Sequence, residues 1–245
     1  MTAPFPTRKQ EEWRYADLEA LQPVWEQLRE PERIAVLPGQ ALEQVWLPTE
    51  DAVQVRRVNV SLGAGASLRL FALNAAEQYG RIELQVDLAD GAEFELFAAN
   101  IGSGLSTNEI VSNVRHLEPN GRSKQVVRSV LNGKAVGTYL GKIEVARDAQ
   151  KTDAEQSVKA MLLDRGATAN AKPELEIFAD DVKCAHGATV GELDADELFY
   201  LGSRGLPPAE ARALLLEGFI MGLWHGAADP DAICEAAREA LRSVV

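Results

Sequence analysis

The chain has 245 residues, of which 46% are hydrophobic and 25% charged, as in a soluble globular protein with a sizeable core. Its 25 basic and 37 acidic side chains give a net charge of −12, which disfavours nucleic acid and membrane surfaces as partners and favours proteins. Two cysteines are too few for a disulfide framework, and no apolar run approaches the roughly 20 residues of a membrane helix, so we expect a cytoplasmic protein with reduced thiols.

Residues 1–50 are predicted to form an N-terminal segment with short helices. The helical pattern covers residues 11–30, is broken at Pro23 and ends near Pro31. The aromatic residues Trp13 and Tyr15 are predicted to dock this segment onto the main body.

Residues 51–192 are predicted to form a β-helix core, because apolar residues recur there at every second position, as in Val58, Val60 and Leu62. A recurring turn begins at four glycines that lie 26, 30 and 45 residues apart: Gly65, Gly91, Gly121 and Gly166. An up-and-down barrel or a sandwich would use similar turns. The irregular repeat and the absence of a long helical pattern favour a β-solenoid.

Residues 193–245 are predicted to form a C-terminal helical module. Asp194 and Glu197 resemble a capping box, and Pro207-Pro208 is typical of a second helix start. That helix carries an apolar stripe, which would pack either on the end of the solenoid or into a groove of another protein.

The sequence holds no P-loop, no nucleophile elbow and no H-E-x-x-H helix, so it offers no nucleotide-binding or hydrolase motif of these kinds. The alternative to a non-catalytic protein is a β-helix enzyme that acts on polysaccharide. Such an enzyme would need a groove of carboxylates on successive coils, and the sequence shows no such ladder.

Cys184 and His186 are the candidate functional residues. They stand two apart, so on a strand they project from one face, where an imidazole could influence the thiol or both could approach a metal. The structural alternative is a small buried cysteine beside a histidine that bonds a backbone carbonyl. His116, which precedes a turn, is interpreted as a surface residue.

The stretch KPELEIFADDVKCAHGATVGELDADELFYLGSRGL, residues 172–206, closely resembles the C-terminal core of the SufB/SufD family, and RKQEEWRYADL, residues 8–18, resembles the N-terminal signature of its SufD branch. The resemblance implies a right-handed parallel β-helix followed by helices. It implies a non-catalytic scaffold subunit of iron–sulfur cluster assembly that pairs with SufB through the β-helix ends and docks the ATPase SufC through the C-terminal helices.

The resemblance also assigns residues and ligands. His186 matches a histidine at the interface with SufB and would contact metal transiently, with Cys184 beside it. The ATPase-docking helices would present Leu206, Leu214, Leu215 and Phe219. The isolated chain would hold no stable cofactor, an iron–sulfur cluster would form transiently with SufB, and a flavin is possible in the complex. An isolated chain could form a homodimer through the same strand edges.

Overall fold

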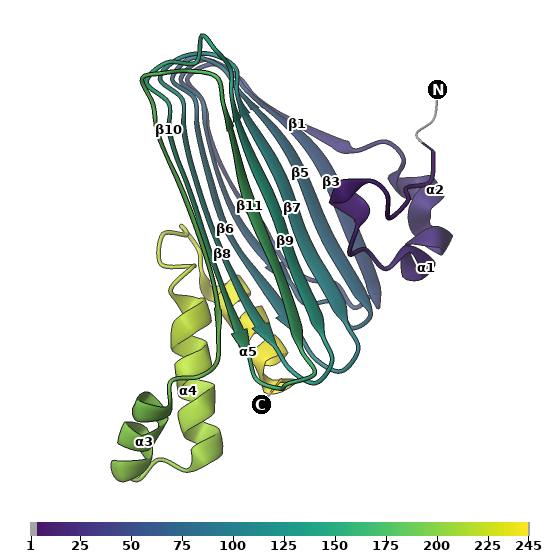
Figure 1. Cartoon of the computed structure of the whole chain (residues 1–245), viewed down its shortest axis with the longest axis vertical. Helices are drawn as coiled ribbons and strands as arrows, with labels where there is room; N and C mark the ends of the chain where they lie inside the picture. Colours follow the sequence, from purple (N-terminus) through teal and green to yellow (C-terminus); the bar gives the residue numbers. More distant parts are fainter. Residues whose placement is uncertain (1–3, 245) are drawn as a thin grey trace.

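The computed structural model describes residues 4–244, and in them twelve parallel strands form a solenoid of six two-strand coils (Figure 1). Odd-numbered strands build one six-stranded sheet and even-numbered strands the other, each in chain order. This confirms the parallel β-helix predicted from the sequence. The strands are β1 (Glu32–Val36), β2 (Ala41–Trp46), β3 (Val53–Leu62), β4 (Ser67–Asn74), β5 (Tyr79–Leu88), β6 (Glu93–Gly102), β7 (Thr107–His116), β8 (Arg122–Leu131), β9 (Val136–Val145), β10 (Asp153–Leu162), β11 (Thr168–Ile177) and β12 (Lys183–Gly191).

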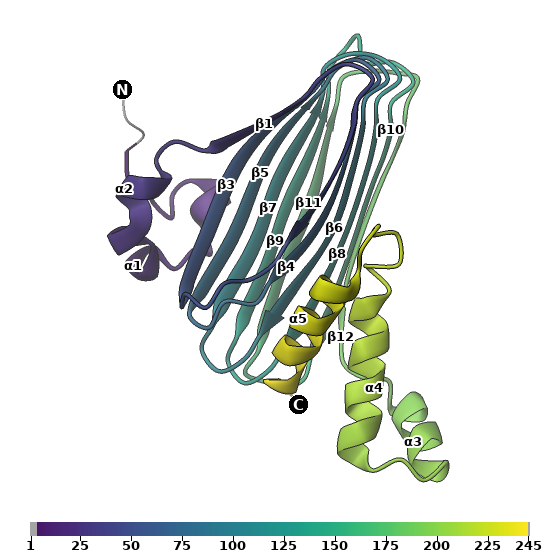
Figure 2. The same cartoon turned by 180° about the vertical axis from the view of Figure 1, so that it is seen from behind.

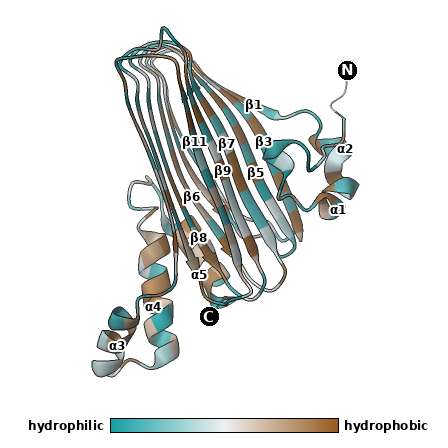
Figure 3. Ribbon diagram, in the orientation of Figure 1, coloured by the Kyte–Doolittle hydropathy of each residue, from teal (hydrophilic) through white to brown (hydrophobic). Residues whose placement is uncertain are grey.

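The core lies between the two sheets, because alternate side chains of every strand point inward and stack on the equivalent residue of the next coil. Val60 of β3 stands beside Val86 of β5, and both are 2% exposed or less. Figure 3 shows the corresponding bands of hydrophilic and hydrophobic residues on the strands. Burial of stacked aliphatic side chains contributes about 25 cal/mol for each Å² of apolar surface removed from water. The inward side chains of the period-two pattern therefore stabilise the stack of coils.

The four turn glycines predicted from the sequence all lie at corners of the solenoid, for two different reasons. Gly65 and Gly91 adopt left-handed backbone angles with φ of +63°, which favour glycine. At the third repeat Asn120 takes the left-handed position, and Gly121 is needed for space, since a Cβ there would lie 2.7 Å from His116 Nδ1. A Cβ at Gly166 would lie 2.5 Å from the Gly133 carbonyl oxygen.

His116 is buried, which corrects its interpretation as a surface residue. It ends β7 with its side chain in the interior, 0% exposed, and its Nε2 atom lies 2.9 Å from Ser123 Oγ. Its Nδ1 atom has no hydrogen-bond partner. Burial lowers the pKa of His116 to about 4, so the ring is neutral in the folded protein at pH 7.

The solenoid begins earlier than the sequence predicted, since β1 and β2 lie within residues 1–50. The helical part of that segment is short and consists of η1 (Glu11–Trp13), α1 (Leu18–Leu21), η2 (Gln22–Val24) and α2 (Trp25–Leu28). It lies beside β3 and β5 (Figure 1). The predicted docking role of Trp13 is confirmed, because Trp13 is 4% exposed, packs in one cluster with Tyr79 of β5 and lies 3.7 Å below the Arg81 guanidinium.

Arg81 of β5, one member of a buried ion pair within the solenoid, joins this N-terminal segment to the strands. Arg81 and Glu109 are both 0% exposed, and Arg81 Nη1 lies 3.0 Å from Glu109 Oε2. The Tyr79 hydroxyl donates to the same carboxylate oxygen at 2.8 Å. The Arg81 guanidinium also lies 3.7 Å from the centre of the Trp13 ring and donates to the Glu12 carbonyl oxygen at 2.9 Å. Arg81 therefore binds the segment at two points, and Arg57 of β3, which donates to the Leu28 carbonyl oxygen at 2.9 Å, provides a further attachment.

The C-terminal helices are α3 (Ala195–Ser203), α4 (Pro208–Met221) and α5 (Asp231–Arg242). The predicted cap of α3 is confirmed, since the Asp194 carboxylate accepts hydrogen bonds from the backbone of Asp196 and Glu197. Helices α4 and α5 pack on the outer face of the even-numbered sheet rather than on the solenoid end (Figure 2), where Trp224, 1% exposed, meets the Phe71 ring. Within residues 4–244, none of the helices has the length and apolarity that crossing a membrane requires.

Candidate functional site at the open end of the solenoid

The last coil leaves two strand edges without a neighbour in the described chain. β12 pairs with β10 alone, and β11 pairs with β9 alone. Every residue of β12 except Cys184 is exposed, and Ile177, Phe178 and Val190 are large apolar side chains that remain 39–58% exposed at this end. Unpaired backbone groups and exposed apolar side chains together are typical of an edge that receives another strand.

His186 lies on this open edge. It is the register partner of Gln156 on β10, whose side chain points into the solenoid, so His186 belongs to the same inward-facing column. Because no seventh coil covers it, the imidazole is exposed to solvent instead of buried. The structure thus brings the predicted histidine to a strand margin where a partner can reach it.

Cys184 shares the inward face with His186, as predicted, but its surroundings differ. It is half-buried against an apolar corner cluster that includes Ala154, its register partner. Burial, together with the nearby Asp153 carboxylate, raises the pKa of the Cys184 thiol. At neutral pH the group is therefore mainly a neutral thiol, which is a poor metal ligand until a cation or partner changes its environment.

A buried polar network that the sequence analysis missed lies directly beneath His186. The Ser112 and Tyr139 hydroxyls donate to Gln125 Oε1 at 2.6 and 3.2 Å, and Gln156 Nε2 donates to the Tyr139 hydroxyl at 3.2 Å. All four side chains are 2% exposed or less. Burial raises the pKa of the Tyr139 phenol, so Tyr139 keeps its proton and remains a hydrogen-bond donor.

One signal in the sequence could have found this network. Gln125 stands two residues before the inward Val127, and Gln156 two residues before the inward Val158, so both glutamines lie at inward positions of the period-two pattern. A polar residue at a position where the period-two pattern demands an apolar one has to be hydrogen-bonded inside the core. The residues were therefore predictable as a buried polar pair, although their neighbours were not.

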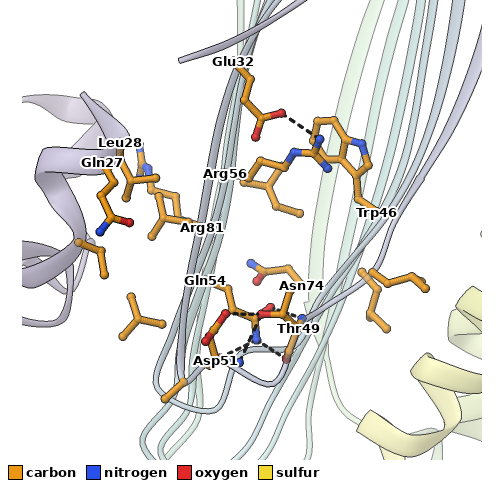
Figure 4. Close-up of a pocket in the computed structure, with 17 residues that line it drawn as sticks. Gln27, Leu28, Glu32, Trp46, Thr49, Asp51, Gln54, Arg56, Asn74 and Arg81 are labelled. Atoms are coloured by element: carbon orange, nitrogen blue, oxygen red, sulfur yellow. Dashed lines mark hydrogen bonds and ion pairs between the residues drawn. The ribbon is translucent and has the colours of Figure 1, made fainter. Parts of the chain in front are cut away.

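A cavity lies at the opposite end, where β1 covers only half of β3 and leaves residues 53–57 paired with β5 alone. It has a volume of about 620 Å³ (Figure 4). Inside it the Arg56 guanidinium stacks 3.9 Å from the centre of the Trp46 ring and bonds Glu32 Oε2 at 3.0 Å. The Trp46 ring and the Glu32 carboxylate are thus both in contact with Arg56, and Trp46 is only 6% exposed. The cavity thus presents no open aromatic face for a flavin ring, and flavin binding stays a prediction.

The four residues predicted to dock an ATPase are not equivalent. Leu214 on α4 is 49% exposed, whereas Leu206 and Leu215 are partly buried. Phe219 packs against the cluster between helix and sheet, and the Arg128 guanidinium lies over its ring at 5.3 Å. Of these four residues, Leu214 is the most exposed. It lies on a hairpin of α3 and α4 that extends away from the sheets (Figures 1 and 2).

Two outward-facing carboxylates of the solenoid are paired with basic residues on neighbouring coils. Asp87 Oδ2 lies 2.6 Å from Arg115 Nη2, and Glu95 Oε2 lies 2.9 Å from Arg69 Nε. These two carboxylates are therefore not free to act in a polysaccharide-cleaving groove. The part of the chain that the structure describes also contains no group of three or more His, Cys, Asp or Glu side chains placed to hold a metal ion.

Comparison with known proteins gives one family-model match and several similar sequences. Residues 42–219, from β2 to α4, match the family model described as SUF system FeS cluster assembly, SufBD core domain. The chain is 35% identical over 170 residues to an iron–sulfur cluster assembly SufBD family protein of Synechocystis, a match that covers 69% of this chain and 38% of that relative.

Two relatives carry the name iron–sulfur cluster assembly protein SufD. The Escherichia coli protein is 37% identical over 125 residues, which are 50% of this chain and 30% of the relative. The Bacillus subtilis protein is 30% identical over 131 residues, which are 54% of this chain and 30% of the relative. The chain thus spans less than two fifths of the length of each of these three curated relatives.

Proposed function

Because this chain belongs to the SufBD family of iron–sulfur cluster assembly proteins, we propose that it is a non-catalytic scaffold subunit that pairs with a SufB-like chain and docks a SufC-like ATPase. The observation that carries the proposal is the open last coil, with His186 on strand β12, whose outer edge has no neighbouring strand. A partner strand would satisfy the free backbone groups and cover the exposed apolar residues.

The chemistry of cluster formation explains why a partner is needed. Iron–sulfur clusters are held mainly by cysteine thiolates, with histidine as an occasional ligand. At this end the chain offers one exposed imidazole and one half-buried thiol, of which Cys184 is the weaker ligand because burial raises its pKa. The remaining thiolates would come from the SufB-like chain, and the cluster would be cargo assembled between the two subunits.

The first test replaces His186 with alanine in the complex with SufB and SufC. We expect the variant to form the complex but to assemble iron–sulfur clusters at least about tenfold less well, because a metal-contacting imidazole is lost. The measurement is the visible absorbance of the cluster after reconstitution with iron and sulfide. Thr189→Ala is the matched control, since Thr189 is also exposed on β12 but faces outward. Wild-type cluster yield in His186→Ala would refute the assigned role.

The second test addresses ATPase docking. Leu214→Asp is expected to weaken binding to SufC by about tenfold or more, because it places a charge on an exposed apolar side chain of the α3–α4 hairpin. Folding stability should change by less than about 0.5 kcal/mol, as for other surface substitutions. Leu105→Asp, at a solenoid corner where the leucine is 81% exposed, is the control. Equal SufC affinity of both variants in a calorimetric titration would place the docking surface elsewhere.

A further inference from the structure

The inward-facing column that ends at His186 contains a glutamine in each of the two coils beneath it. Gln125, Gln156 and His186 occupy neighbouring register positions on β8, β10 and β12. Gln125 is 0% and Gln156 1% exposed. Since neighbouring parallel strands lie about 4.8 Å apart, side chains on one face of adjacent coils are within hydrogen-bonding reach of each other.

The hydrogen bonds fix how Gln156 is oriented. The 2.6 Å distance from Ser112 Oγ to Gln125 is short for an N–H donor and typical of a hydroxyl bonded to an oxygen, so the carbonyl oxygen of Gln125 faces the hydroxyls. Tyr139 then gives its single proton either to that oxygen or to Ser112 Oγ, both 3.2 Å away, and in either case its hydroxyl oxygen accepts a hydrogen bond from Gln156 Nε2. Gln156 therefore uses its amide nitrogen inside the network.

The carbonyl oxygen of Gln156 remains without a partner. Gln156 Oε1 is buried and makes no hydrogen bond with any described residue. An unsatisfied buried acceptor costs about 1–3 kcal/mol, so a donor in the next coil would be stabilised by it. The register partner in that coil is His186, whose exposed ring has the freedom to turn toward it.

We infer that Gln156 is a positioning residue for His186: its Oε1 atom accepts a hydrogen bond from one imidazole nitrogen and directs the other nitrogen out of the open end. A neutral imidazole has one donor and one acceptor nitrogen, so this bond selects one tautomer. The outward nitrogen is then the one with a free lone pair for iron. The consequence for cluster assembly rests on the proposed function, but the hydrogen bond itself does not.

The test is nitrogen NMR of the isolated chain labelled in its three histidines, with His186→Ala used to assign the His186 signals. In the wild type at a pH where the ring is neutral, we expect the two ring-nitrogen shifts of a single tautomer. Gln156→Met keeps the length of the side chain but removes the acceptor, so the shifts should move toward those of a mixture. Gln156→Glu restores an acceptor and should restore the single tautomer.

Gln44→Met is the matched control, because Gln44 begins the same inward column at the opposite end of the solenoid, where the register runs from Gln44 through Leu70 and Leu96 to Gln125. It should leave the His186 shifts unchanged. Identical His186 shifts in the wild type and in Gln156→Met would overturn the inference, whatever the thermal stability of the variant.

Cluster assembly provides a separate readout. We expect Gln156→Met to lower cluster yield by on the order of tenfold, as for other residues that orient a metal ligand, and Gln156→Glu to recover it. If the tautomer depends on Gln156 but His186→Ala assembles clusters normally, the positioning role holds and the proposed function of His186 fails. If His186→Ala loses cluster formation and Gln156→Met alters neither tautomer nor yield, the positioning role fails alone.

Discussion

Arg81→Ala is expected to lower the free energy of unfolding by about 3–5 kcal/mol, the cost of leaving one member of a buried ion pair without its partner. The variant would leave the Glu109 carboxylate buried without its cation. Burial already raises the pKa of Glu109, against the opposing effect of the Arg81 guanidinium. It would also remove the cation that contacts the Trp13 ring and the Glu12 carbonyl oxygen. The N-terminal segment should therefore loosen, which a red shift of tryptophan fluorescence would report.

Urea unfolding of three variants separates this effect from a simple loss of charge. Arg122→Ala removes a cation of the same type from an exposed pair with Glu93, whose side chains are 70% and 50% exposed, and should cost less than about 1 kcal/mol. The double variant Arg81→Met with Glu109→Leu should recover most of the lost stability, because the Glu109 charge is removed together with its partner and Glu83 keeps its ion pair with Arg57. Equal unfolding midpoints for Arg81→Ala and Arg122→Ala would contradict the assignment.

The Arg81→Ala deficit should also depend on pH. Without the guanidinium, the pKa of Glu109 rises further, and the carboxyl takes up a proton as the pH falls. A protonated carboxyl no longer carries a buried charge. The difference in stability between Arg81→Ala and the wild type is therefore expected to narrow in acid.

The buried His116 is expected to make the wild-type protein about 3 kcal/mol less stable at pH 4 than at pH 7, apart from the contribution of the carboxylates. The pKa of His116 in the folded protein, about 4, lies below the ordinary 6.5. Between these pH values the histidine is therefore protonated in the unfolded chain but not in the folded one. The stability is complete above pH 6.5 and is lost as the pH falls toward 4. A shift of one pKa unit corresponds to about 1.36 kcal/mol, which gives the magnitude.

Urea midpoints from pH 4 to pH 8 for the wild type and His116→Gln measure this contribution. The glutamine does not titrate, so its stability should fall less steeply between pH 6.5 and pH 4 than that of the wild type. His225→Gln, at an exposed histidine after α4, should keep the wild-type slope. Parallel pH profiles for His116→Gln and the wild type would contradict the prediction.

Within the candidate site, the sequence predicted that Cys184 and His186 share one face, because side chains on a strand alternate. It did not distinguish their environments. Cys184 meets the corner cluster of the preceding coils, whereas His186 has no coil above it, and that difference depends on where the solenoid stops. The Gln156 partner of His186 is 30 residues away in sequence and adjacent only through strand register.

The local pattern of the chain determined its strands, its corner glycines, the cap of α3 and the docking role of Trp13, since each depends on residues close together in sequence or on a period of two. The tertiary structure alone decided which surface each element covers. It buried His116, moved the start of the solenoid to Glu32 and laid α4 and α5 along the outside of a sheet. Stacking brings together residues about 30 positions apart, and the physical outcome at each position depends on the coil above and below it, which the pattern of a single coil does not contain.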